Sequence, residues 1–239
     1  MQIQHSDFAT KASIRCSLKR GLARQAMRHA EATEADLPRI VALAAAVRPN
    51  LKSLQRLAVR VQGQIGVVRV ALTSDGAGVI AFVRNVRQVR TQVEAREVFT
   101  EAAIVYTRME IRCSWGVATY RISRASFCLH ALERLVERSD VVTDRPLLTW
   151  VDSEALQILR AIKRGQDFQE DGDHFVPAIA SGVWAGSVDA AGLEEDWGLT
   201  SAGPDVVPFF SARTFLSMDQ MRPTVWLRCC GDHGLLMAK

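Results

Sequence analysis

The chain has few cysteines, and they follow no regular spacing. An odd number without a repeated spacing does not indicate a disulfide framework, and no C-x-x-C pair is present that would predict a structural zinc site. The adjacent pair near the C-terminus is a poor candidate for a bridge, because vicinal disulfides are strained. We therefore expect a reducing, cytoplasmic compartment. The five cysteines are Cys16, Cys113, Cys128, Cys229 and Cys230.

Long hydrophobic runs are also missing. The longest apolar stretches, such as residues 40–47, are far too short to cross a bilayer. Residues 1–15 contain no apolar run of the kind that a signal peptide needs. We therefore expect no membrane partner. With 48% hydrophobic and 23% charged residues over 239 positions, the composition is that of a globular protein, and the length suits one large domain or two small ones.

The motifs that bind common cofactors are absent. The sequence contains no G-x-x-x-x-G-K-[ST], no G-x-G-x-x-G and no G-x-S-x-G, so P-loop hydrolysis, a dinucleotide cofactor and α/β-hydrolase catalysis are unsupported. No zinc-deaminase, zinc-finger or RRM signature is present. The acidic segment 167–174 has neither EF-hand spacing nor H-E-x-x-H, so we interpret it as a solvated loop. We predict no metal and no other cofactor.

Charge is plentiful but unevenly divided. Residues 1–138 carry 22 Lys/Arg and 11 Asp/Glu, a net +11, whereas residues 139–239 carry 8 and 15, a net −7. Such a split favours a surface that meets polyanions, although the two halves can also fold together and spread their charges over one surface. Of the 30 basic residues 25 are Arg, which binds phosphate through paired hydrogen bonds and stacks on bases. A GC-rich genome produces the same bias.

The order of the expected elements indicates an α+β fold, with N-terminal helices followed by a mainly antiparallel sheet and packed helices. We predict a flexible N-terminus over residues 1–16 and a single α+β domain over 17–239, with candidate boundaries near 50 and 140. The expected helices are 18–31, a second capped by Thr33, 126–138, 153–164 and a short one within 219–228. The expected strands begin near Leu57, where β-branched residues become frequent and Gly63 and Gly66 argue against a helix. The turn 73–78 is expected to join this region to a strand at 79–83 in a hairpin. Within 102–122, which has a turn at 114–116, Met109, Ile111 and Cys113 alternate with Arg108, Glu110 and Arg112, as in a half-buried strand. A second hairpin is expected from 175–179 and 182–188, and a last strand at 206–214.

The clearest constellation lies at residues 122–138, I-S-R-A-S-F-C-L-H-A-L-E-R-L-V-E-R. If Ser126 opens a helix, His130, Arg134 and Arg138 follow at i, i+4 and i+8 and form one stripe. An imidazole can move a proton near neutral pH, and guanidinium groups can hold a phosphate and the charge that develops on it. Alternatively, His130 is a structural histidine, and Arg134 pairs with a glutamate of the same helix or an acid of the C-terminal half.

This segment resembles the S-x-H-A-L-x-R-x-x-x-R helix of small RelE-like ribonuclease toxins and related prokaryotic families. The resemblance covers residues 122–138 alone, and the gap between Ser126 and His130 is longer than in that pattern. It implies metal-independent cleavage of RNA, with His130 and Arg134 as catalytic residues and Arg138 as a nucleic-acid contact.

Further arginines are candidates for nucleic-acid binding. Arg84, Arg87 and Arg90 recur at a period of three among valines, which on a helix would place them along one side. Arg213 lies in the expected strand 206–214, and it or Thr214 would complete a phosphate site if that strand lies beside the helix of His130.

Two classes of function follow. The first is a nucleic-acid-binding protein, for RNA more than DNA, which in its sharpest form is a metal-independent ribonuclease or toxin-like factor. The second is a non-catalytic protein-interaction factor, such as a phage or mobile-element antagonist of a nucleoprotein complex, whose arginines meet acidic protein patches. A third option is an oligomeric scaffold in which the basic half of one copy docks on the acidic half of another.

Overall fold

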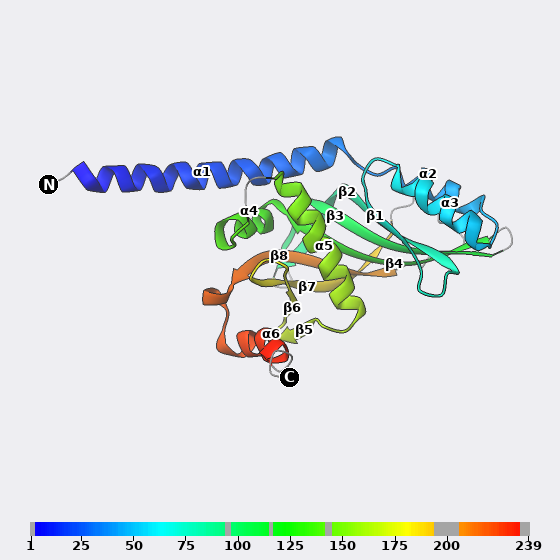
Figure 1. Cartoon of the computed structure of the whole chain (residues 1–239). Coiled ribbons are helices and arrows are strands. Elements are labelled where there is room, and N and C mark those ends of the chain that lie inside the picture. Colours follow the sequence, from blue (N-terminus) through cyan, green and yellow to red (C-terminus); the bar gives the residue numbers. More distant parts are fainter. Residues whose placement is uncertain (1–2, 94–96, 115–116, 142–144, 194–205, 235–239) are drawn as a thin grey trace. The chain divides into compact units, whose positions relative to one another are not determined.

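The computed structural model describes residues 3–93, 97–114, 117–141, 145–193 and 206–234, and within these ranges the side chains of residues 3–16, 90–93, 97–99, 191 and 230–234 are left undescribed (Figure 1). The predicted α+β class is confirmed. The elements in chain order are α1 (Ile3–Ala32), α2 (Leu37–Ala45), α3 (Leu51–Gln62), β1 (Val67–Leu72), β2 (Gly78–Val93), β3 (Glu97–Ser114), β4 (Val117–Cys128), α4 (Leu129–Arg138), α5 (Leu147–Lys163), β5 (Phe168–Glu170), β6 (Asp173–Pro177), β7 (Gly182–Gly192), β8 (Val206–Ser217), a 3-10 turn (Met218–Gln220) and α6 (Pro223–Gly234).

The strands form one sheet in the order β1-β2-β3-β4-β8-β7-β6-β5. The pairs β1–β2, β2–β3, β5–β6 and β6–β7 are antiparallel. By its internal contacts the chain divides into two compact units, each built from separate stretches. The chain passes from one to the other after residues 29, 126, 186 and 211, away from the boundaries expected near 50 and 140. The first unit comprises residues 1–29, 127–186 and 212–239, and the second comprises residues 30–126 and 187–211.

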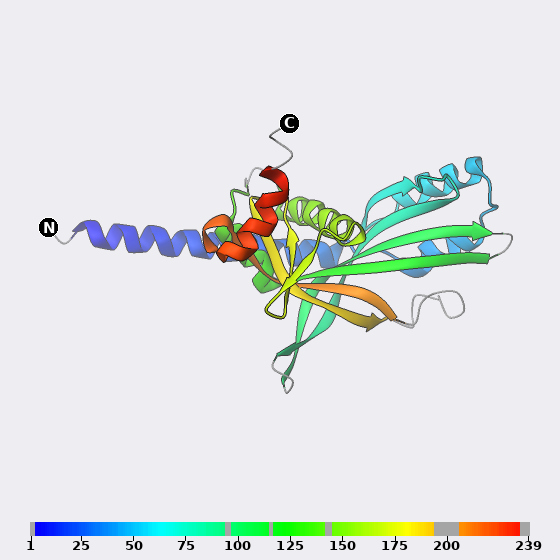
Figure 2. The same ribbon diagram turned by 90° about the horizontal axis from the view of Figure 1, so that it is seen from below.

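In the second unit, α2 and α3 cover one face of the strands β1 to β3 (Figures 1 and 2). Leu54, Leu57 and Val61 recur at helical spacing and are at most 2% exposed. The sheet meets them with the alternate residues of β2 and β3, because successive side chains of a strand point to opposite faces. The residues of β2 and β3 that pack in this hydrophobic cluster are Val79, Ala81, Val83, Met109, Ile111 and Cys113.

The prediction of strands from Leu57 onward is wrong, because α3 continues to Gln62. Gly63 caps the C-terminus of α3 instead of breaking a helix. Gly66 has φ +73°, and a Cβ there would lie 2.3 Å from the backbone nitrogen of Ala35. The two glycines therefore mark the end of a helix and a close crossing of two backbones. The β-branched residues that favoured strands belong partly to α3 and partly to β1.

Three helix starts also differ from the prediction. The first helix begins at Ile3, well before residue 18. Asp36, not Thr33, caps α2 by accepting a hydrogen bond from the Arg39 backbone nitrogen at 3.0 Å. Ser126 lies in β4 and is 3% exposed, so α4 is capped by the Cys128 sulfur, which accepts from the Ala131 nitrogen at 3.4 Å. For α2 and α4, the polar residue that the sequence pattern favoured as a cap has another position in the fold.

The hairpins are predicted more accurately. Strands β1 and β2 pair across the turn at 73–77, and β6 and β7 pair across residues 178–181, as expected. The last expected strand, 206–214, is present as β8. Of the turn expected at 114–116, residues 115–116 lie outside the described residues. The alternation Arg108/Glu110 against Met109/Ile111 is present in β3, but both faces are buried there, because Arg108 and Glu110 form an ion pair at 2.9 Å.

In the first unit, the buried carboxylate of Glu154 on α5 fixes the β6–β7 turn. Glu154 is 1% exposed and accepts hydrogen bonds from the backbone nitrogens of Ala180 (2.8 Å) and Ile179 (3.0 Å). It also accepts from the Trp184 indole nitrogen at 3.0 Å, and the Trp184 ring packs edge-on against Phe215. Burial raises the pKa of the Glu154 carboxyl, although these three donors act in the opposite direction.

We predict that Glu154→Gln lowers the free energy of unfolding by about 1–3 kcal/mol, because the new amide nitrogen faces one of the three donors. Because the folded-state pKa of Glu154 is raised, its protonation stabilises the fold below the usual carboxyl pKa, and this gain is lost as the pH rises through the raised value. The melting temperature of the wild type relative to Glu154→Gln should therefore rise as the pH falls from neutral toward the usual pKa. Glu133→Gln on α4 is the control, and a pH-independent difference for Glu154→Gln would contradict the linkage.

Candidate nucleic-acid interface

The structure brings His130 and Arg134 together on α4. His130 is exposed, and the Arg134 Nε donates a hydrogen bond to its Nε2 at 3.4 Å. The Arg134 Nη1 also forms an ion pair with Glu137 at 2.6 Å. Pairing with a glutamate of the same helix is one of the alternatives that the sequence left open. The guanidinium of Arg134 is thus already engaged with two neighbours on its own helix.

The third residue of the stripe, Arg138, reaches β8. Its Nη1 donates to the backbone oxygen of Phe215 at 2.9 Å and to the Thr214 hydroxyl at 3.5 Å. The strand that carries Thr214 and the half-buried Arg213 therefore lies beside α4, the arrangement on which the expected phosphate site depended. Desolvation, followed by the positive charge of Arg134, lowers the pKa of Arg138. Arg138 anchors the end of α4 to the sheet.

The arginines of β2 do not form one stripe. The segment is a strand in unbroken register with β3, so a spacing of three places neighbouring arginines on opposite faces. Arg84 is 7% exposed and donates to the Thr33 hydroxyl at 2.7 Å. Arg87 pairs with Glu34 at 2.8 Å. The side chain of Arg90 lies outside the described residues. The helical interpretation of this segment is corrected, and the guanidinium groups of Arg84 and Arg87 are engaged within the fold.

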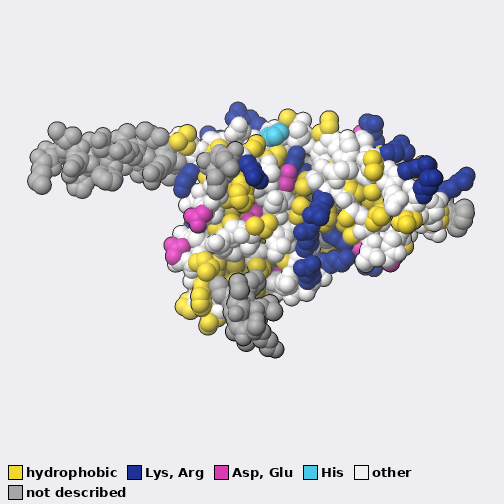
Figure 3. Space-filling model, viewed as in Figure 1, with side chains coloured by type: hydrophobic (Ala, Val, Ile, Leu, Met, Phe, Trp, Pro, Cys, Tyr) yellow, Lys and Arg dark blue, Asp and Glu magenta, His cyan; other side chains and the backbone are white. Residues whose placement is uncertain are grey.

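A basic surface that the sequence reasoning missed covers α2 and α3. Residues 37–74 contain six Lys/Arg and no Asp or Glu. All six side chains are exposed, and no ion pair involves them in the part of the chain that the structure describes. Figure 3 shows Lys and Arg side chains gathered over α2 and α3. We call this surface the basic face, and its residues are Arg39, Arg48, Lys52, Arg56 and Arg60. The sixth cation, Arg69 on β1, pairs with Phe82 and points to the sheet face that α2 and α3 do not cover.

The two acidic residues that flank the run are held by other groups. Asp36 caps α2. Asp75 accepts hydrogen bonds from the Thr73 hydroxyl (2.6 Å) and the Ala77 nitrogen (3.1 Å), and it pairs with Arg112 at 2.9 Å. These three contacts lower the pKa of Asp75 to about 2. The positive charge of the basic face is therefore not neutralised by the carboxylates next to it in sequence.

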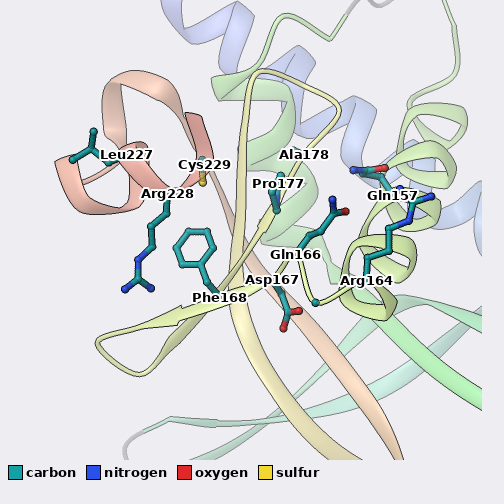
Figure 4. A pocket seen from close by; sticks show the side chains of 11 residues that line it. Gln157, Arg164, Gln166, Asp167, Phe168, Pro177, Ala178, Leu227, Arg228 and Cys229 are labelled. Carbon is teal, nitrogen blue, oxygen red and sulfur yellow. The ribbon is translucent and has the colours of Figure 1, made fainter. Parts of the chain in front are cut away.

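A pocket of about 710 Å³ lies in the first unit, between the end of α5, the β5–β6 hairpin and α6 (Figure 4). Arg228 lies over the Phe168 ring at 5.5 Å and donates to the Gln169 backbone oxygen. Asp167 lies 3.8 Å from the Nδ1 of His174. The lining carries charges of both signs, and it does not favour a polyanion. Among the described residues, no three His, Cys, Asp or Glu side chains are placed to hold a metal ion.

Catalysis by α4 has a direct test. If His130 is a general acid or base, the protein cleaves RNA in the presence of EDTA, and His130→Ala lowers the rate by about 10²- to 10⁴-fold. Glu133→Gln on the same helix is the control and should leave the rate unchanged. Equal cleavage by wild type and His130→Ala, or no cleavage by either, would contradict the ribonuclease hypothesis.

Comparisons with known proteins identify no relative from which a function can be carried over. The chain matches no protein-family model, no curated protein and no solved structure. No described helix is both long and apolar enough to span a membrane. The site with the clearest chemical character is thus the basic face, defined by its own residues.

Proposed function

We propose that this protein binds nucleic acid through the basic face on α2 and α3. The observation that carries the proposal is the run of six exposed cations in residues 37–74 without an acidic residue among them. A solvated protein surface normally intersperses charges of both signs. A surface of one sign instead attracts a polyanion over a distance of about 10 Å at moderate salt.

The spacing of the cations suits a chain of phosphates. Lys52, Arg56 and Arg60 follow at i, i+4 and i+8 on α3, so successive side chains are offset by about 6 Å along the helix axis. Arg48 lies just before α3, and Arg39 lies on α2, which packs with α3 against the same strands. Each arginine can bind a phosphate through paired hydrogen bonds, and each bound phosphate releases counterions.

The other basic side chains either form bonds within the fold, which leaves them less available to a ligand, or lie outside the basic face. The guanidinium groups of Arg134 and Arg138 are engaged with neighbours on α4 and β8. In the first unit, Arg20, Arg24 and Arg28 form a second exposed row on α1. This row supports a polyanion partner for the chain as a whole. Cleavage of that partner by His130 is a separate hypothesis with its own test.

A salt titration tests the proposal. The logarithm of the binding constant should fall linearly with the logarithm of salt concentration between about 50 and 200 mM, because bound phosphates release counterions. Replacing Arg39, Arg48 and Arg60 with Gln should lower the slope of this plot by about three if each contacts one phosphate. Fluorescence anisotropy with labelled duplex DNA and RNA gives both quantities.

The matched control replaces Arg121, Arg145 and Arg164 with Gln. These arginines are also exposed but lie outside the basic face, so the same charge is removed and the slope should change little. Equal losses in both triple variants would contradict the assignment to the basic face. Absence of binding by the wild type at low salt would contradict nucleic-acid binding itself and favour an acidic protein partner.

A further inference from the structure

The exposed side of α3 carries more than positive charge. Leu54, Leu57 and Val61 fix the buried side, so the opposite side points away from the sheet. At about 100° per residue, Lys52 and Val59 lie near the middle of that side, with Gln55 on one flank and Arg56 on the other. All four are exposed, and Val59 is 74% exposed although nothing on the sheet requires an apolar residue there.

These four side chains are of the types that read base edges. In the major groove of DNA, Arg or Lys donates two hydrogen bonds to guanine, Gln bonds to adenine through two atoms, and a small apolar side chain contacts the thymine methyl group. Val59 and Gln55 carry no charge and form no ion pair with a phosphate, so a surface that bound only phosphates would not require them. The mixture therefore indicates contact with bases as well as with the backbone.

The dimensions of α3 fit this groove. An α-helix with its side chains is about 10–12 Å wide, and the B-DNA major groove is about 12 Å wide and 8.5 Å deep. The helix is joined to α2 by the short connection 46–50 and packs with it against the same strands. In DNA-binding proteins with two such consecutive helices, the second enters the groove and the first crosses the backbone. Arg39 on α2 and Arg48 in the connection are placed for the phosphates.

The basic face contains cations before and after the segment of α3 that carries Gln55, Arg56 and Val59. Arg60 lies near the end of α3, whereas Arg48 precedes its start. The turn 73–77 lies next to the start of α3, since a Cβ on Gly76 would lie 3.9 Å from the Leu51 side chain. Its one carboxylate, Asp75, is paired with Arg112 and does not oppose a phosphate.

We infer that α3 is a recognition helix that binds in the major groove of duplex DNA and discriminates base sequence through Gln55, Arg56 and Val59. This inference rests on the proposed nucleic-acid function and narrows it to B-form DNA. The major groove of A-form RNA is too deep and narrow for side chains to read, so the same helix has no equivalent site on duplex RNA.

The test selects binding sites from DNA duplexes with a randomised centre, using the full chain. Wild type should enrich a short motif and bind it more tightly than duplex RNA of the same sequence. On the selected motif, Arg56→Ala and Gln55→Ala should each weaken binding by about 5- to 150-fold, the effect of losing one bidentate base contact. On random duplex the same variants should lose much less, and their own selections should relax at single positions.

Two controls separate base reading from charge and from unfolding. Arg48→Ala should weaken binding to all sequences alike, and Arg121→Ala on β4 should leave both affinity and motif unchanged. Unchanged melting temperatures show that each variant folds. If the wild type binds nucleic acid with steep salt dependence but enriches no motif, or binds duplex RNA equally well, the inference is overturned while the proposed function stands. If it binds no nucleic acid at low salt, both are overturned.

Discussion

The packing of α3 on the sheet is the constraint on which the proposed interface depends. Leu54, Leu57 and Val61 bury one side of the helix against the alternate residues of β2 and β3. The side chains on the opposite side of the helix, among them Lys52 and Arg56, therefore face solvent. The packing that stabilises α3 thus also sets the direction in which the cations of the proposed interface project.

Features governed by a local period of two were predictable from sequence. The alternation around Met109 and Ile111 correctly gave a strand, and the turn at 73–77 correctly gave a hairpin. Residues 57–66 were misinterpreted because β-branched residues and glycines weigh against a helix locally, whereas burial of three residues at helical spacing decides the outcome. Gly66 shows the limit most clearly: a Cβ there would clash with the backbone of Ala35, a residue distant in sequence.

In the candidate sites, too, the features set by local sequence were predictable, and those set by contacts between distant residues were not. The row of His130, Arg134 and Arg138 was predicted from spacing, and α4 does present these residues. The sequence does not specify that Arg138 would bond to the backbone of Phe215, because that contact joins a helix to a strand from another part of the chain. Conversely, the basic face belongs to a stretch of sequence without acidic residues, but a comparison of net charge between the two halves of the chain does not distinguish this stretch from its neighbours. Only the exposure of its five cations on two adjacent helices identifies it as a surface.

The composition of the basic face has a consequence for how binding would be controlled. Residues 37–74 contain no histidine, cysteine, tyrosine or carboxylate, and the bordering Asp75 is held ionised by its three partners. Nothing in the run therefore changes its charge state across the range of pH in which cells live, nor does it contain a thiol that oxidation could modify. The proposed binding of a polyanion would therefore respond to ionic strength and to competing partners but not to acidity or redox state.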